Sequence, residues 1–197
     1  MRKTGWLIGL GVVVLLGFAV ASGYNHLVQL DQDVQAQWAQ VESAYQRRAD
    51  LVPNLVATVK GSAKFEQDTL TAVTEARARV GQVAPPSAPP GDPAALQRFQ
   101  QAQDQLSSSL SRLLVVAERY PELKTTTAFR DLMAQLEGTE NRISVERMRF
   151  NEAARGFNAA RSRLPTVLVA NLFGSRFAPK AYFQSQAGAA TAPRVQF

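Results

Sequence analysis

The sequence lacks cysteine and has a single histidine, His26, among its 197 residues. The absence of cysteine excludes disulfides, thiolate metal sites and a cysteine nucleophile. One histidine cannot form a histidine-rich metal site. We interpret His26 as an ordinary polar residue and not as part of a Ser-His-Asp catalytic triad. The sequence also contains no glycine-rich phosphate loop and no HExxH pattern. We therefore predict no enzymatic activity, no metal site and no cofactor.

Aromatic residues are scarce, at 8% of the chain, and no strand-like alternation of apolar and polar residues occurs between residues 24 and 164. A composition rich in Ala, Gln, Leu, Val and Arg favours helices over sheets. The formal net charge is +6, but the basic residues are interspersed with acidic ones. This pattern is typical of a solvated helical surface, so we do not expect a nucleic-acid partner.

An uncharged apolar run covers residues 6–22. As a helix it would be about 26 Å long, close to the roughly 30 Å hydrocarbon thickness of a bilayer. Trp6 and Tyr24 bracket the run, where amphipathic rings favour the two membrane interfaces. The run therefore predicts a transmembrane anchor that contacts lipid, within a first segment covering residues 1–23.

The charges around this run predict its orientation. Arg2 and Lys3 precede it, whereas the first charged residues after it are Asp31 and Asp33. The positive-inside rule then keeps the N-terminus cytoplasmic, and we expect a single-pass protein of the inner membrane whose remaining chain lies outside the cytoplasm. A signal peptide cleaved after Ala21 is the alternative.

Apolar residues recur at spacings of three and four from residue 27 to residue 164. Two patterns meet at Pro53, a third begins at Asp92-Pro93, and a fourth begins near Thr127. A proline-rich loop, residues 81–93, separates the second from the third. We predict an all-α protein in which residues 24–164 form an antiparallel up-and-down four-helix bundle of long helices. The alternative is a three-helix version, continuous through a kink at Pro53.

The fourth pattern is the most regular, because apolar residues recur in it every seven positions. These residues are Phe129, Leu136, Ile143, Phe150, Phe157 and Leu164. The repeat predicts an apolar seam packed at a shallow angle on neighbouring helices. Residues 165–197 follow it as a predicted irregular tail.

In an up-and-down bundle, the join between the first two helices and the join between the last two lie at the same distal end. Both predicted joins are charged and contain a proline, so we predict a partner-docking tip. Its candidate residues are Arg47, Arg48, Asp50, Asn54, Glu118, Arg119, Tyr120, Glu122 and Lys124.

A second set of polar residues lies near the predicted core seams: Glu66, Arg77, Glu140, Arg147, Asn151 and Asn158. We expect Glu66 and Glu140 to be paired with an arginine such as Arg77 or Arg147, fixing helix register. A carboxylate-only site remains the alternative for the two acids. The asparagines either specify register or form a polar binding stripe.

The end of the chain offers another surface. The second half of the fourth pattern is rich in arginine, and the tail carries aromatic residues beside Arg176 and Lys180. This region either lies on an anionic membrane surface or folds its aromatics back onto the bundle. The aromatic residues concerned are Phe173, Phe177, Tyr182 and Phe183.

Several long stretches resemble the LemA family of bacterial membrane proteins. They include RRADLVPNLVATVKG at 47–61, LLVVAERYPELK at 113–124, LEGTENRISVERMRFNEAARGFN at 136–158 and LFGSRFAPKAYF at 172–183. The resemblance implies an N-terminal anchor and long antiparallel helices, and it transfers no catalytic residue. It also implies a role in organising membrane compartments or alongside membrane proteases.

The leading hypothesis is a non-catalytic scaffold or adaptor of the bacterial envelope, bound to an unidentified protein through the distal tip. A ligand-sensing module with a polar core around Glu66, Glu140 and Asn151 is one alternative. The other is a membrane-surface organising protein that uses the basic helix and aromatic tail. Homo-oligomer formation is left open.

Overall fold

The structure is a computed structural model that describes residues 2–61, 66–83, 89 and 91–184. Its long helices are α1 (Arg2–Lys60), α2 (Gln67–Gln82), α3 (Pro93–Ala117) and α5 (Thr127–Arg161). The short elements are α4 (Pro121–Lys124), α6 (Thr166–Leu172) and the 3₁₀ helix η1 (Gly174–Phe177). The described residues contain no strand, which confirms the prediction of an all-α protein.

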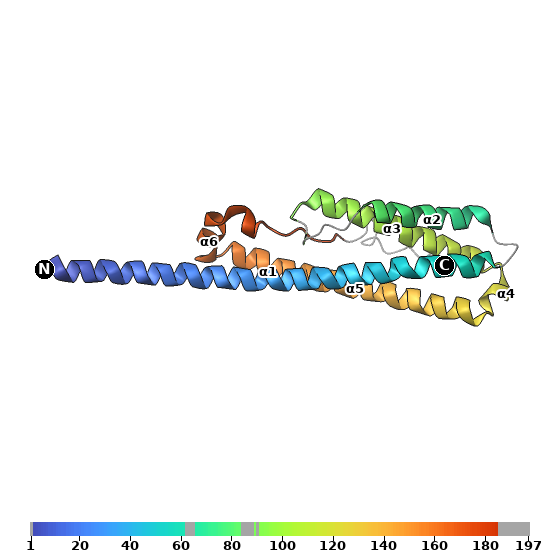
Figure 1. Ribbon diagram of the computed structural model, residues 1–197, viewed down its shortest axis with the longest axis horizontal. Helices are drawn as coiled ribbons and strands as arrows, with labels where there is room; N and C mark the ends of the chain where they lie inside the picture. Colours follow the sequence, from blue (N-terminus) through green and yellow to red (C-terminus); the bar gives the residue numbers. More distant parts are fainter. Residues whose placement is uncertain (1, 62–65, 84–88, 90, 185–197) are drawn as a thin grey trace, which may run out of the picture.

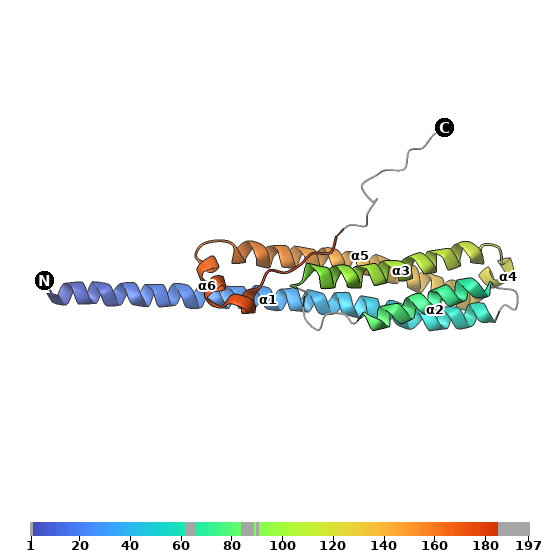
Figure 2. The ribbon, with the colours of Figure 1, turned by 90° about the horizontal axis from the view of Figure 1, so that it is seen from above.

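Helix α1 runs along the whole molecule, and its first part extends beyond the other helices (Figure 1). Helix α5 packs along the second part of α1, α2 packs along α3, and α1 also contacts α2. Figures 1 and 2 place α4 at one end of this helical body and α6 at the end that faces the protruding part of α1.

Helix α1 does not end at Val52 as predicted, but continues through Pro53 to Lys60. A proline inside a helix leaves the carbonyl four residues earlier without its usual N–H donor. Here Arg77 of α2 donates to that carbonyl, Ala49 O, from Nε at 3.1 Å. This bond satisfies the freed carbonyl and joins α2 to α1. The three-helix alternative was right that the helix continues through Pro53 but wrong that the first two patterns form one helix, because α2 is a separate helix.

The core consists of two apolar clusters. One surrounds Trp38 near the middle of α1, where its ring centroid lies 5.3 Å from that of Phe150 and 6.0 Å from that of Phe99. The other contains buried residues of α1, α2, α3 and α5 nearer to α4. The predicted seam of α5 is buried from Phe129 to Phe157, but Leu164 is 77% exposed because α5 ends at Arg161.

The joins around α3 match the prediction in part. Asp92 caps α3, its side chain accepting from Ala94 N at 2.9 Å, and Pro93 occupies the first turn. Six residues of the predicted proline-rich loop, 84–88 and 90, lie outside the described residues.

The predicted irregular tail is partly helical. Helix α6 and η1 occupy its first part, and residues 178–184 then run back over the body without regular structure. Phe177 and Phe183 are buried in the Trp38 cluster, whereas Phe173 and Tyr182 remain 43% and 42% exposed. The Phe173 ring centroid lies 4.8 Å from that of Tyr24 in α1, and the Tyr182 hydroxyl accepts from Asn158 Nδ2 at 2.7 Å, so all four aromatics contact the body.

The protruding part of α1 exposes its large apolar side chains: Trp6, Leu7, Leu10, Val12, Val13, Val14, Leu15, Leu16, Phe18 and Val20. Within the described residues, α1 alone is long and apolar enough to cross a membrane. The rest of α1, from Ser22 to Lys60, adds about 57 Å at roughly 1.5 Å per residue.

Candidate functional site

A buried arginine joins three helices in the middle of the body. Arg48 of α1 is 1% exposed. Its guanidinium donates to Glu140 Oε1 of α5 at 2.7 Å, to Ser107 Oγ of α3 at 2.6 Å, and to the Gln103 side-chain and main-chain oxygens. The Glu140 side chain is 42% exposed, so only one end of this ion pair reaches solvent. The arrangement is structural, because the guanidinium is enclosed by its own partners.

This placement corrects the prediction for the first half of the tip. Because α1 continues past Pro53, roughly 18 Å of helix separates Arg48 from Lys60. Arg47, Asp50 and Asn54 are exposed on the same middle stretch of α1, and Asp50 accepts from Gln46 Nε2 at 2.9 Å. None of these four residues lies at the distal end.

The second half of the predicted tip does lie at the distal end, around α4. Lys124 pairs with Glu118 at 2.6 Å, and Arg119 pairs with Glu66 at 3.0 Å. Tyr120 packs against the adjacent core cluster, and Glu122 is exposed. The Arg119 bond ties the start of α2 to the end of α3. It also corrects the expectation that Glu66 is buried, since its side chain is 43% exposed.

A hollow of about 470 Å³ opens beside this corner, between the end of α3 and the start of α5. Its walls combine apolar and charged side chains: Leu114, Ala117, Glu118, Lys124, Phe129, Arg130, Met133, Ala134 and Glu137. On α3 nearby, Val115 is 67% exposed. Within this lining the apolar side chains are buried or half-buried, apart from the small Ala134, and the charged ones are exposed.

The predicted asparagine pair holds the tail. Asn158 donates from Nδ2 to Lys180 O and accepts from Lys180 N, both at 2.9 Å. Asn151 makes the same two bonds, also at 2.9 Å, with Phe183. Each amide therefore satisfies both backbone groups of one tail residue, and the two asparagines are half-buried rather than buried.

Arg147 and Gln100 complete this attachment. Arg147 donates to Gln184 O at 2.9 Å, and its guanidinium lies 4.8 Å from the centre of the Phe183 ring. Gln100 of α3 donates to the same carbonyl at 2.9 Å. Arg147 is thus not the partner of Glu140, which pairs with Arg48 instead. The polar stripe of α5 is occupied by the chain's own backbone.

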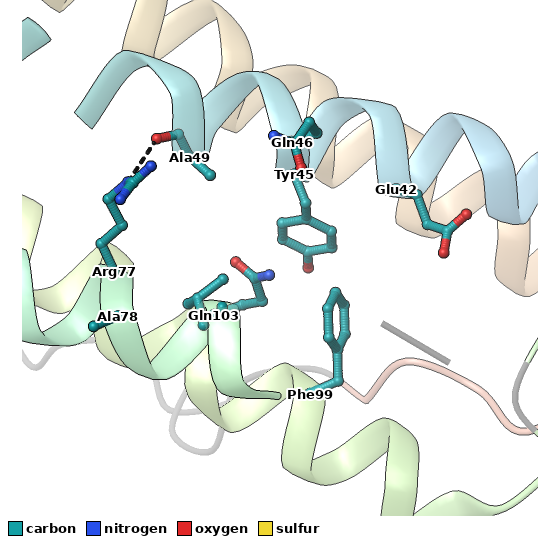
Figure 3. Close-up of a pocket in the computed structure, with 10 residues that line it drawn as sticks. Glu42, Tyr45, Gln46, Ala49, Arg77, Ala78, Phe99 and Gln103 are labelled. Carbon is teal, nitrogen blue, oxygen red and sulfur yellow. Dashed lines mark hydrogen bonds between the residues drawn. The ribbon is translucent and has the colours of Figure 1, made fainter. Parts of the chain in front are cut away.

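A cavity of about 390 Å³ lies between α1, α2 and α3 (Figure 3). Tyr45, Phe99 and Gln103 point toward one another beside it, and the Arg77–Ala49 bond closes one side. Burial raises the pKa of the Tyr45 hydroxyl, and the nearby guanidinium groups of Arg147 and Arg48 oppose this shift. Glu66, Glu140 and Asn151, around which a polar core was predicted, do not line this cavity; each lines a different hollow, so the three do not share one site.

Two buried acids were not singled out by the sequence analysis. Asp31 is 1% exposed and lies 2.7 Å from Lys180 Nζ and 3.6 Å from Arg176. Glu146 is 3% exposed and lies 3.2 Å from Arg149. A signal did exist for Asp31, because Asp31, Trp38, Tyr45, Val52 and Val59 recur every seven residues.

Arg48 also lies in such a row, because Val34, Val41, Arg48 and Leu55 recur every seven residues. A charged residue in an apolar row is a candidate for a buried pair.

Among the residues that the structure describes, no cluster of three or more histidine, cysteine or carboxylate side chains could hold a metal ion. The geometry defines an all-helical protein with an exposed apolar N-terminal segment and a body whose buried polar side chains bind one another or the backbone. Residues 37–197 match the LemA family, so the chain belongs to that family and its resemblance is confirmed.

The chain is similar to the magnetosome protein MamQ of Magnetospirillum gryphiswaldense, with 25% identity over 186 residues that cover 85% of this chain and 68% of that protein. It is also similar to the magnetosome protein MamQ 2 of Paramagnetospirillum magneticum, with 26% identity over 182 residues that cover 83% of this chain and 65% of that protein. These relatives and the apolar helix support association with a membrane.

Proposed function

We propose that this protein is a membrane-anchored, non-catalytic scaffold that holds a protein partner at the distal corner around α4. Residues 6–22 span the inner membrane, with the N-terminus in the cytoplasm and the body outside it. In this proposal the long helices α1, α2, α3 and α5 are arranged as an antiparallel up-and-down bundle. Membership of the LemA family and the likeness to MamQ support the membrane role.

The continuity of α1 is the observation that carries the proposal. One helix of 59 residues, Arg2–Lys60, contains both the apolar segment and the distal end of the body. A continuous helix transmits position without a hinge, so the α4 corner is held about 57 Å from the end of the apolar segment. A fixed distance of this kind is useful for placing a partner away from the bilayer.

The docking surface consists of the hollow beside α4 and its charged rim. Glu118, Lys124, Arg130 and Glu137 surround a floor formed by Leu114, Ala117, Phe129 and Met133. The floor would accept an apolar side chain of the partner, and the mixed charges would select its orientation. We therefore place the docking site at the α3–α4–α5 corner and not at the predicted tip residues of α1.

Photo-crosslinking in intact cells tests this surface. A photoreactive residue is placed at Glu122 or Arg130, with Arg47 as the control position because it is exposed on the middle of α1. We expect one dominant crosslinked protein from the first two positions and not from the control. Equal crosslinking from all three positions, or none from the corner, would contradict the proposal.

Exchanging the charges of Glu118 and Lys124 tests partner recognition separately from the stability of the fold. The double substitution E118K/K124E keeps an ion pair between the two positions, which lie 2.6 Å apart, but reverses the charges offered to a partner. We expect the crosslink at position 122 to be lost while the urea midpoint stays the same. An unchanged crosslink would show that this rim does not select the partner.

A further inference from the structure

We propose that α6 and Leu164, two residues before it, form a second membrane contact, in which Leu164, Leu168 and Leu172 enter the lipid interface beside the transmembrane segment. We call these three residues the leucine patch. The inference rests on the membrane span of the proposed function and is independent of the docking corner.

The position of α6 along α1 brings the leucine patch to the membrane surface. The apolar run ends at Ser22, and the next residue, Gly23, lies against α6. A Cβ atom at Gly23 would lie 3.2 Å from Val169 Cγ2 and 3.6 Å from Thr166 Cγ2, so the missing side chain allows α6 to approach closely. Helix α6 thus lies at the level where the apolar part of α1 ends, as Figures 1 and 2 show.

The contact with α1 decides which face of α6 remains open. Thr166, Val169 and Ala170 are buried, whereas Leu168 and Leu172, one turn apart, are 65% and 72% exposed. Leu164 is 77% exposed. The body covers one face of α6, and the residues that the structure describes leave the leucine face exposed.

The composition of the exposed surface identifies lipid as the occupant. Among the described residues, the exposed leucines fall in two places: the apolar part of α1, at Leu7, Leu10, Leu15 and Leu16, and the leucine patch. Both places adjoin the membrane. The leucine patch lies at the level of Gly23, just beyond the end of the apolar run of α1, so a bilayer that covers the run reaches the patch without a second protein.

The charges around the patch fit the same occupant. Between residues 161 and 184 the sequence has no acidic side chain and four basic ones, Arg161, Arg163, Arg176 and Lys180. Arg176 and Lys180 pair with Asp31 of α1, so the positive charge offered to lipid comes mainly from Arg161 and Arg163. A short amphipathic element with leucines on one face and basic residues nearby suits an anionic membrane surface. The leucine patch would fix the rotation of the body about α1, which a single span leaves free.

Spin labels at single cysteines test this contact, because the chain has no cysteine of its own. The probe positions are Leu168, Val115 and Leu15, with similar exposures of 65%, 67% and 69%. The full-length L168C, V115C and L15C variants are reconstituted in vesicles of phosphatidylcholine and phosphatidylglycerol. Collision of each label with oxygen, which concentrates in lipid, is compared with collision with a water-soluble nickel chelate.

We expect the labels at positions 168 and 15 to favour oxygen and the label at position 115 to favour the nickel chelate. A label at 168 that behaves like the one at 115, while 15 reports lipid, would overturn the leucine patch and leave the span intact. A label at 168 shielded from both reagents would overturn it in favour of a protein cover. If all three labels favour nickel, both the span and the patch are wrong.

Discussion

Replacing Glu140 by leucine should destabilise the body more than replacing Arg48, its partner. The E140L substitution removes the carboxylate that lies 2.7 Å from the guanidinium. Arg48 then keeps its hydrogen bonds to Ser107 and Gln103, but its positive charge has no counterion. Since Arg48 is 1% exposed, water cannot compensate for this loss.

The Arg48 and Glu140 side chains differ in exposure, and this difference determines how much stability each substitution is expected to cost. Breaking a buried ion pair from one side costs about 3–5 kcal/mol. We expect about 3 kcal/mol for E140L, at the low end, because the Glu140 side chain is 42% exposed. The reciprocal R48M substitution leaves a carboxylate that water can reach, so we expect about 1–2 kcal/mol. The R48M/E140L double variant should be more stable than E140L alone, because it contains no unpaired charge.

Urea unfolding of the full chain in detergent micelles measures these differences. A W6F background leaves Trp38 as the one tryptophan, and its ring lies in the cluster with Phe150, apart from the Arg48 network. If E140L costs no more than R48M, then Arg48 is hydrated in solution and the network does not hold the three helices together.

Three further results are expected. The R77M substitution should lower the free energy of unfolding by about 1 kcal/mol when Pro53 is present. It should lower it clearly less in a P53A background, because the N–H of residue 53 then donates to Ala49 O. A double-mutant cycle measures this coupling between Arg77 and Pro53. The N158A substitution should lower the free energy of unfolding by about 1–2 kcal/mol and speed hydrogen exchange at the Lys180 amide. Unchanged exchange would refute the role of Asn158 in holding the tail. Because the pKa of Tyr45 is raised in the folded state, its neutral form contributes stability that is fully present below about pH 10. Above about pH 10 the free energy of unfolding should fall by up to about 1.4 kcal/mol per pH unit from this group. The Y45F variant should lack this contribution to the pH dependence of stability.

The elements that the sequence predicted correctly are those with strong local signals. The seven-residue spacing of apolar residues predicted the buried face of α5, since a helix buries whichever stripe is apolar. The Asp92-Pro93 pair predicted the start of α3, because a cap and a first-turn proline act within a few residues of each other. Such signals depend on the chain nearby and need no knowledge of the tertiary fold.

The errors arose where a distant residue compensates for a local one. Pro53 indicated a helix end because its missing N–H frees a carbonyl, but the donor that replaces it, Arg77, comes from another helix. Since that compensation is tertiary, the local pattern could not reveal it. One misplaced boundary then put Arg47, Arg48, Asp50 and Asn54 at the distal tip. The corner around Glu118 and Lys124 was predicted because its Tyr120-Pro121 stop is local.

The polar contacts of α1 explain how one register is selected along so long a helix. Apolar rows that repeat every seven residues would tolerate a slide of one repeat, about 10 Å, with much of their packing kept. Asp31, Arg48 and the Ala49 carbonyl would each lose their partners in such a slide. Those partners lie on the tail, on α3 and α5, and on α2, so every major part of the body fixes α1 independently. The distance from the apolar segment to the α4 corner is therefore set by these polar contacts of α1, and losing any one of them should loosen it.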